Sequence, residues 1–254
     1  MPLKILVKFP TRNRPAQFLK VLRMMVEMSA KPEDIAYLVS TDSDDTSMNK
    51  DVELQAVQVT KNIVFKQFEI TDDNRKSRTK VNAINLDMEL VEGWDIVLLA
   101  SDDMVPQVQG WDEAIRKAFG EESVNTVSTD KVWESEEPGF SATGKTTVTT
   151  EHNLDQALWF FDGHQHRICT LIVMGRKRYE YYNYLYHPSY ISLWCDNEWT
   201  EVNQPKKFDT ILFKHEHPAW GGAVPNDALY QRNEAYFERD RMNYEKRKQL
   251  NFPI

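Results

Sequence analysis

Short apolar runs alternate with amphipathic helical stretches along the first part of the chain, and few folds accommodate this rhythm. The apolar runs lie at residues 3–9, 35–39, 63–68 and 96–100. Between them, apolar side chains recur at helical spacing, at Phe18, Leu22, Met25 and Val26 and again at Val81, Ile84, Met88 and Val91. Strand, helix and strand in this order predict an α/β fold with a mostly parallel sheet flanked by helices.

Ligands of such sheets bind beyond the carboxyl ends of the strands. Three of the predicted strands end in polar segments, namely Pro10-Thr11-Arg12-Asn13-Arg14, Thr41-Asp42 and Ser101-Asp102-Asp103. Any one of them is explained by the general polarity of loops. Together they predict a binding site, because they combine two arginines with a pair of acids.

Two interpretations compete for each of these groups. Arg12 and Arg14 suit bidentate recognition of phosphate, but they would equally form surface ion pairs with the excess of acids. Asp102 and Asp103 suit a divalent cation such as Mg²⁺, because adjacent carboxylates repel each other unless they are neutralised. They would otherwise cap the helix expected over residues 111–119. Lys80 and Asn82 open the helix before the fourth strand and would add donors to the same crevice.

Composition excludes several classes of protein. The 254 residues carry a formal net charge of −8, which argues against a cationic surface for nucleic acid or anionic lipid. Two cysteines, Cys169 and Cys195, make neither a disulfide framework nor a zinc ribbon. No apolar run approaches the roughly 20 residues of a membrane span, and no signal-peptide core is evident. We therefore expect a cytoplasmic protein.

The rhythm breaks from about residue 120 onward. Residues 121–150 are polar and rich in Thr and Ser, which predicts irregular or hairpin structure. A strand is expected over 168–174, followed by a basic and aromatic stretch at 176–190, and a final helix over 226–250. Without a linker or repeat, we expect a single domain over residues 1–254. Residues 1–105 would be its first half, 106–225 a mixed second half and 226–254 a C-terminal helix.

One pattern match is rejected on its context. Residues 139–146 fit the phosphate-loop expression GxxxxGK[ST], which requires a buried strand before the loop and a helix after it. An acidic, proline-ended segment precedes the match, and the β-branched run at 147–150 that follows is poor at opening a helix.

A second acidic segment follows the apolar residues 191–194. Asp196 and Glu198 lie beside Trp199, and a carboxylate walled by tryptophan rings becomes more basic, as a general base requires. Capping of a helix is the alternative. His215 and His217 alternate along a predicted strand, so at most one of them faces the crevice. A structural role is the simpler interpretation for either histidine. The more specific alternative is that one of them coordinates an ion held by Asp103.

These motifs resemble the GT-A glycosyltransferases, close to the large family-two group of bacterial or phage type. Residues 3–15 resemble the family's first strand and nucleotide loop. Leu98-Leu-Ala-Ser-Asp-Asp-Met104 followed by Gly110-Trp111 resembles the acidic metal motif, although Ala100 stands where the family has an Asp. The segment 194–198 is similar to the one that supplies the catalytic base in inverting members.

The resemblance implies that residues 1–105 are the nucleotide-sugar-binding half and 106–225 the acceptor-side half, and it implies roles for individual residues. Pro10, Thr11, Arg12, Arg14, Asp42, Lys80, Asn82, Ser101 and Asp102 would bind the nucleotide sugar. Asp103 would bind Mn²⁺ or Mg²⁺ together with His217, or less favourably His215. Asp196 would be the general base, with Glu198 as its substitute. Trp194 and Trp220 would contact the acceptor.

The implied reaction transfers a sugar from a nucleoside diphosphate, with UDP favoured, to a hydroxyl acceptor, and inverts the anomeric carbon. The acceptor would be a glycan or a modified nucleic acid, since the rings and cations at 176–190 suit sugars as well as unstacked bases. A non-catalytic nucleotide-sugar-binding module is the main alternative. A nucleotidyltransferase is disfavoured because the loop at 10–15 contains no glycine.

Overall fold

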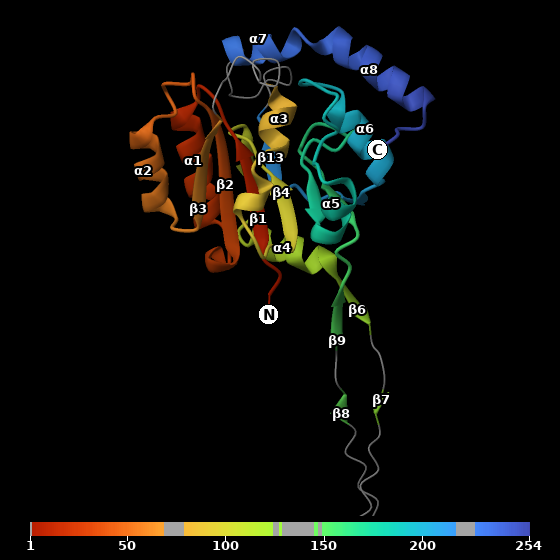
Figure 1. Ribbon diagram of the computed structural model, residues 1–254. Coiled ribbons are helices and arrows are strands. Elements are labelled where there is room, and N and C mark those ends of the chain that lie inside the picture. Colours follow the sequence, from red (N-terminus) through yellow and green to blue (C-terminus); the bar gives the residue numbers. More distant parts are fainter. Residues whose placement is uncertain (1, 69–78, 124–126, 129–144, 147–148, 217–226) are drawn as a thin grey trace, which may run out of the picture.

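The computed structural model describes residues 2–68, 79–123, 127–128, 145–146, 149–216 and 227–254. The centre of the molecule is a seven-stranded sheet with the order β12-β10-β11-β4-β1-β2-β3 (Figure 1). Its strands are β1 (Ile5–Pro10), β2 (Ile35–Asp42), β3 (Ile63–Phe68), β4 (Ile96–Leu99), β10 (Ala157–Phe160), β11 (Val173–Gly175) and β12 (Lys206–Phe208). Strands β4, β1, β2 and β3 are mutually parallel, as the sequence predicts.

The second half of the chain adds an antiparallel element to the same sheet. Strand β11 pairs antiparallel with both β4 and β10, and β10 pairs parallel with β12. The sheet is therefore mixed, and strands from both halves of the sequence hydrogen-bond within it. The expected strand over 168–174 is shorter, because the preceding backbone bonds elsewhere: the Cys169 N–H donates to the Thr200 hydroxyl at 2.9 Å.

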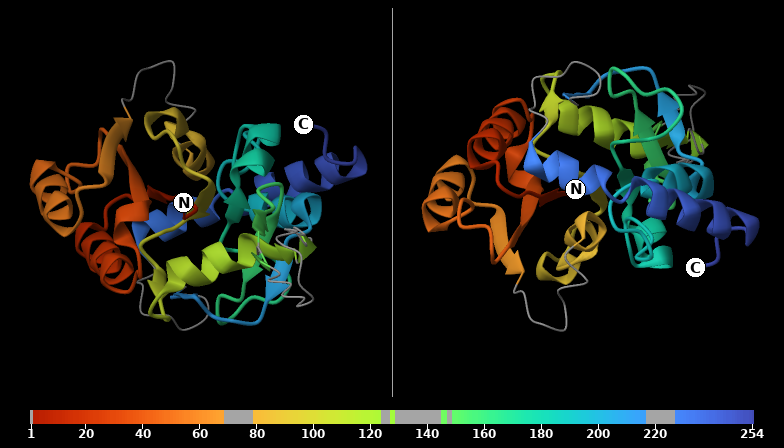
Figure 2. Two further views of the ribbon diagram at one scale, coloured as in Figure 1. Left: turned by 90° about the horizontal axis from the view of Figure 1, so that it is seen from below. Right: turned by 90° about the horizontal axis from the view of Figure 1, so that it is seen from above.

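Helices cover both faces of the sheet (Figure 2). They are α1 (Pro15–Glu27), α2 (Lys50–Val59), α3 (Lys80–Asn85), α4 (Trp111–Phe119), α5 (Arg176–Tyr182), α6 (Cys195–Asn203), α7 (Ala228–Glu234) and α8 (Phe237–Gln249). One buried core joins α1, α2 and α4 to the face of β1 that carries Ile5, Val7 and Phe9. A second core joins α3, α5 and α6 to the opposite face. None of the helices in the described residues is long and apolar enough to span a membrane.

The minor strands form pairs outside the main sheet. Strand β5 (Met104–Pro106) pairs antiparallel with β13 (Phe213–His215). Strands β6 (Gly120–Ser123) and β9 (Thr149–His152), with β7 (Val127–Ser128) and β8 (Lys145–Thr146), form a two-stranded arm that extends from the body (Figure 1). In the rejected phosphate-loop match, Lys145 and Thr146 lie in strand β8, and residues 139–144 lie outside the described residues.

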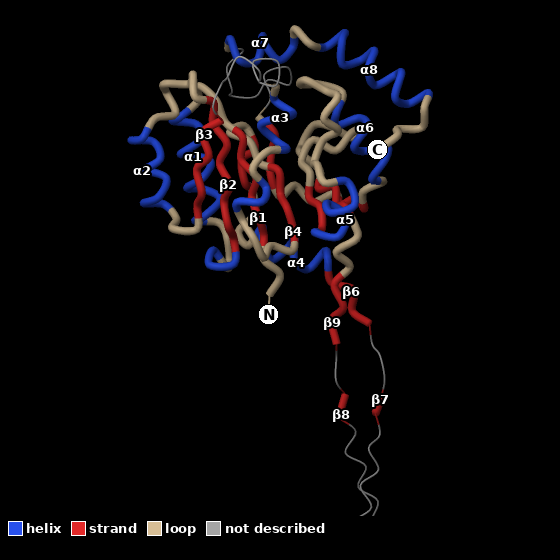
Figure 3. Tube along the Cα trace, in the orientation of Figure 1, coloured by secondary structure: helices blue, strands red, loops and turns tan. Residues whose placement is uncertain are grey.

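The C-terminal segment corrects one prediction. The single helix expected over 226–250 is broken at Ala235 and Tyr236 into α7 and α8. The two helices run across the edge at which the parallel strands end (Figure 3). The break follows from two separate attachments, since Asp227 before α7 bonds to Arg14 and α8 bonds to the region around α6.

Candidate active site

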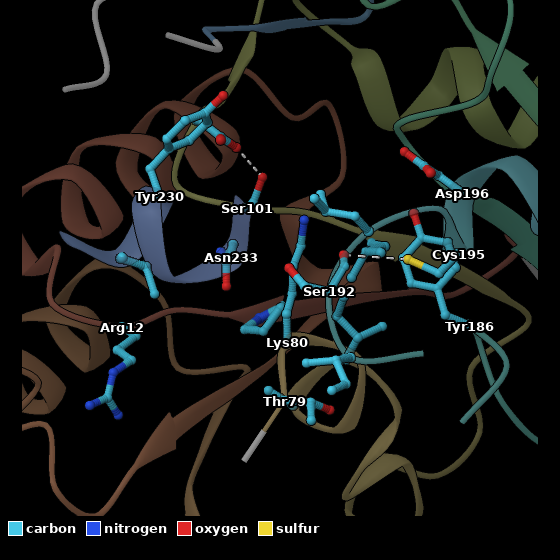
Figure 4. A pocket seen from close by; sticks show the side chains of 18 of the residues that line it. Arg12, Thr79, Lys80, Ser101, Tyr186, Ser192, Cys195, Asp196, Tyr230 and Asn233 are labelled. Atoms are coloured by element: carbon cyan, nitrogen blue, oxygen red, sulfur yellow. Dashed lines mark hydrogen bonds between the residues drawn. The ribbon is translucent and has the colours of Figure 1, made fainter. Parts of the chain in front are cut away.

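A cavity of about 480 Å³ lies at the carboxyl edge of the sheet, a volume within the range of small-molecule sites. Figure 4 shows side chains from several elements turned toward it. Of the residues predicted from the sequence, those that line it are Pro10, Thr11, Arg12, Arg14, Asp42, Lys80, Ser101, Asp102, Asp103, Trp194 and Asp196. Asn82 and Glu198 are not among the lining residues. His217 and Trp220 lie outside the described residues.

Both arginines after β1 are held by carboxylates. The Arg12 guanidinium donates to Asp42 at the end of β2 and to Asp44, with an Nη2–Oδ2 distance of 3.0 Å to the latter. Arg14 donates through Nε and Nη2 to Asp227 at 2.8 and 2.9 Å, and through Nη1 to Asp102 at 3.0 Å. The sequence predicts either ion pairs or phosphate binding for these groups, and the structure has the ion pairs inside the cavity wall.

The two acids after β4 face different surroundings. Asp102 accepts hydrogen bonds from Arg14 and, at 3.1 Å, from the Thr11 hydroxyl. Burial and the adjacent Asp103 raise the pKa of Asp102 to about 6. Burial alone would raise the pKa of Asp103 as well, but the nearby His215 and the Ser101 hydroxyl hold it below its ordinary value. Neither acid caps the following helix, because the N-cap of α4 is Gly110.

Among the described residues, His215 on strand β13 reaches the acids. Its Nε2 lies 3.4 Å from Asp103 Oδ2, and its Nδ1 lies 3.7 Å from Asp162 Oδ2. Burial alone would lower the pKa of His215, but these two carboxylates raise it to about 9. The alternation of His215 and His217 in the sequence predicts that at most one of them faces the crevice. Nothing local in the sequence distinguishes which of the two it is.

Asp162 is a site residue that sequence reasoning missed. Its side chain is 1% exposed and accepts hydrogen bonds from the His164 and Gln165 N–H groups and from the Thr170 hydroxyl at 2.6 Å. It lies behind His215, in the position from which a carboxylate orients an imidazole. In the part of the chain that the structure describes, no group of three or more His, Cys, Asp or Glu side chains is arranged to hold a metal ion.

Asp196 lies in the first turn of α6 and lines the cavity, across from Arg12 in the view of Figure 4. Burial raises the pKa of its carboxyl, and the charge of Lys80 works in the other direction. The N-cap of α6 is Trp194, so Asp196 does not occupy the capping position that the sequence left open.

Glu198, two residues further along α6, has a different environment. Its carboxylate receives Arg247 Nε and Nη2 at 2.7 and 2.8 Å and the Tyr190 hydroxyl at 2.8 Å. Glu198 is 5% exposed and Arg247 is 9% exposed. This buried pair joins α6 to α8, and both carboxylate oxygens of Glu198 are engaged in it.

Comparison with known proteins places this geometry in a known fold. Neither a protein-family model nor a curated protein sequence matches the chain. Among solved structures, the chain is similar to a mannosyltransferase from Pyrobaculum calidifontis in complex with GDP-Man and Mn²⁺, with a TM-score of 0.53 and 12% identity over 87% of this chain and 61% of that one. The chain shares its fold with this mannosyltransferase.

A second similar structure is residues 1–349 of S. aureus TarS in complex with UDP. The TM-score is 0.52 at 12% identity, over 84% of this chain and 60% of that one. A further TarS structure matches 90% of this chain and 38% of its own length, also with a TM-score of 0.52. The chain therefore spans less than two thirds of the length of these neighbours.

Proposed function

We propose that this chain is a metal-dependent glycosyltransferase that moves a sugar from a nucleoside diphosphate to a hydroxyl acceptor with inversion. The observation that supports this most is the composition of this cavity. It is lined by cations and paired acids at the ends of parallel strands and also by Asp196, whose carboxyl has a pKa raised by burial. The fold that the chain shares with a mannosyltransferase in complex with GDP-Man and with TarS in complex with UDP agrees with this arrangement.

The nucleotide side of the cavity suits a diphosphate. Arg12, Arg14 and Lys80 would neutralise its charge, and guanidinium groups bind phosphate oxygens bidentately. Both arginines already hold carboxylates, so a diphosphate must compete with Asp227 or Asp102 for Arg14. Pro10, Thr11, Asp42 and Ser101 would line the rest of the nucleotide site.

The donor atoms beside Arg14 fit a divalent cation that is shared with the substrate. Asp103 offers an oxygen and His215 a nitrogen only 3.4 Å apart, a mixed set that suits Mn²⁺. Such an ion takes its remaining ligands from water and diphosphate oxygens. When bound, the cation supplies electrostatic stabilisation of the departing diphosphate. Asp162 would orient His215 from behind.

Asp196 would act as the general base. The acceptor oxygen attacks the anomeric carbon while the bond from that carbon to the diphosphate oxygen breaks, and the bonding electron pair leaves with the diphosphate. The proton of the acceptor hydroxyl passes to Asp196, whose raised pKa favours proton uptake. Glu198 is less suited to this role because Arg247 and Tyr190 occupy its oxygens.

The donor and acceptor are assigned only by class. One similar structure contains GDP-Man and another contains UDP, so both nucleotides are candidates, with UDP as the first choice. The acceptor would be a glycan or a modified nucleic acid that contacts Trp194, and Trp220 stays a candidate contact. Among the tyrosines at 179–190, Tyr179, Tyr186 and Tyr190 are buried in the core, whereas Tyr181 is 65% exposed.

The test is a panel of UDP- and GDP-sugars incubated with Mn²⁺, Mg²⁺ or EDTA, with release of free nucleoside diphosphate as the readout. The wild type should hydrolyse one donor slowly without acceptor, and EDTA should abolish this release. Asp103→Asn should lose the hydrolysis, whereas Asp196→Asn should lose chiefly acceptor transfer, by about 10²–10⁴-fold. The exposed Glu113→Gln serves as a matched acid control. Metal-independent release, or an unaffected Asp103→Asn, would refute the metal assignment.

A further inference from the structure

The carboxylate of Asp240 on α8 binds three consecutive backbone N–H groups. Asp240 is fully buried, and its Oδ2 receives the N–H groups of Ile191, Ser192 and Leu193 at 3.2, 2.8 and 2.9 Å. Arg239 adds a hydrogen bond to the other oxygen at 2.9 Å. A buried carboxylate with this many donors is fully satisfied, and so are the three amides.

The three amides belong to a loop that forms part of the cavity wall. Residues 191–194 connect Tyr190 to α6 and form neither helix nor strand. Backbone groups in such a loop must be satisfied by other means when they are buried. Asp240 satisfies the loop from one side, and the Val81 N–H at the start of α3 donates to the Ile191 carbonyl at 3.2 Å from the other.

Two residues of the same loop line the cavity and carry a buried polar side-chain atom that has no hydrogen-bond partner within the described residues. Ser192 is 1% exposed and lines the cavity, and within the described residues its hydroxyl has no partner. Trp194 also lines the cavity, and its buried indole Nε1 has no partner among the residues that the structure describes. Buried polar atoms of this kind are costly unless a ligand satisfies them.

We propose that Asp240 is a positioning residue, which holds the loop 191–194 so that Ser192 and Trp194 bind hydroxyl groups of the sugar or of the acceptor. This proposal rests on the proposed glycosyltransferase function. Sugars present dense hydroxyl groups, and the serine hydroxyl and the indole N–H are donors suited to them. Ser192 is thereby assigned as a substrate-binding residue.

Asp240 also sets the position of Asp196. The loop leads directly into α6, in which Asp196 is the second residue, and Trp194 adopts a left-handed conformation with φ of 62° at the junction. A shift of the loop would therefore move the carboxylate that receives the proton. Misplacement of a reacting group by about 1 Å costs on the order of a hundredfold in rate.

The experiment compares Asp240→Asn and Ser192→Ala with the wild type. Glu245→Gln is the control, since it removes an acid from the exposed face of the same helix. Hydrogen exchange of the 191–195 amides reports on the loop, calorimetry with UDP and GDP plus Mn²⁺ reports on nucleotide binding, and the steady-state kinetics of transfer report on the reaction. Circular dichroism confirms that each variant is folded.

Asp240→Asn should accelerate exchange at 191–193 and lower kcat at least about tenfold, with the nucleoside diphosphate Kd unchanged. Ser192→Ala should raise KM about tenfold with the same Kd, as expected for one lost hydrogen bond to a substrate. Glu245→Gln should match the wild type in all three measurements.

Several outcomes would overturn the proposal. Unchanged hydrogen exchange of the 191–193 amides in Asp240→Asn would show that the carboxylate does not hold the loop. The exchange measurement does not depend on turnover, so a failure to turn over any nucleotide sugar would refute the proposed function separately. Should Asp240→Asn not fold, Ser192→Ala decides, because wild-type kinetics in that variant would exclude substrate binding by the loop. Equal losses of nucleotide affinity and transfer would indicate a merely structural role for Asp240.

Discussion

Arg247→Met should destabilise the protein far more than a surface arginine substitution, because it leaves the buried carboxylate of Glu198 without its cation. Arg247 binds both oxygens of Glu198 and also donates to the Pro253 carbonyl at 2.7 Å. Both residues are less than one tenth exposed, so water replaces the lost guanidinium poorly. The methionine retains most of the apolar stem, which confines the change to the charge.

The expected magnitude follows from the burial of the pair. Removing one partner of a buried ion pair costs about 3–5 kcal/mol, whereas a surface pair is worth about 1 kcal/mol or less. Near the midpoint, a chain of 254 residues changes its Tm by about 2 °C per kcal/mol. Arg247→Met should therefore lower the Tm by about 6–10 °C.

Thermal unfolding followed by circular dichroism measures this effect, with Arg241→Met as the matched control. Arg241 lies on the same helix and pairs with Glu238 and Glu245 in the solvent-exposed layer. The double variant Arg247→Met/Glu198→Gln should recover part of the lost stability, because it removes the stranded charge. Equal losses in Arg247→Met and Arg241→Met would refute the account of Glu198 as a structural anchor. The same account would be refuted if Glu198→Gln folds normally but shows the transfer defect that is expected of Asp196→Asn. That result would identify Glu198 as the general base.

Three further predictions concern other parts of the molecule. Burial lowers the pKa of Lys8 from 10.5 to about 8, so the Lys8 ammonium binds its proton more tightly in the unfolded chain than in the folded one. This difference lowers the free energy of unfolding by about 3 kcal/mol below pH 8, and the loss should fade as the pH rises toward 10.5. Urea unfolding at pH 7 and pH 10 should thus show the wild type gaining stability relative to Lys8→Met, and an unchanged difference would contradict the lowered pKa. Gly175→Ala should lower the free energy of unfolding by about 3 kcal/mol in the same assay, because a Cβ at this position would overlap the backbone carbonyl of Leu154. A loss under about 1 kcal/mol would show that the backbone at Leu154 moves to make room for the Cβ. Asp227→Asn should bind UDP or GDP about tenfold more tightly in calorimetry with Mn²⁺. Asparagine still caps α7, but it no longer competes as an anion with the diphosphate for Arg14. Weaker binding would show instead that the Asp227 carboxylate supports nucleotide binding.

Much of the site could be predicted because it lies at strand ends, where position along the chain and position in space coincide. Arg12, Arg14 and the acids 102–103 follow buried parallel strands, and the structure places all of them on one cavity. The helix expected over 111–119 also forms with those bounds, since its apolar residues Trp111, Ile115 and Phe119 recur at helical spacing.

The partners of these residues could not be predicted, because they come from distant parts of the sequence. Arg14 and Asp227 are 213 positions apart, and Asp240 meets a loop 48 positions before its own. No local pattern marks such pairs. One distinction was accessible from the sequence: residues two apart on a helix do not share a face, so only one of Asp196 and Glu198 could face the crevice.

The C-terminal segment also changes what the charges of residues 226–254 mean. The sequence predicts a solvated helix, yet Asp227 binds Arg14, which lines the cavity, and Asp240 binds the loop that leads to Asp196, which also lines it. Helices α7 and α8 thus connect two parts of one site through carboxylates. A change in this segment would alter the surroundings of Arg14 and of the proposed base Asp196 together, although neither belongs to it.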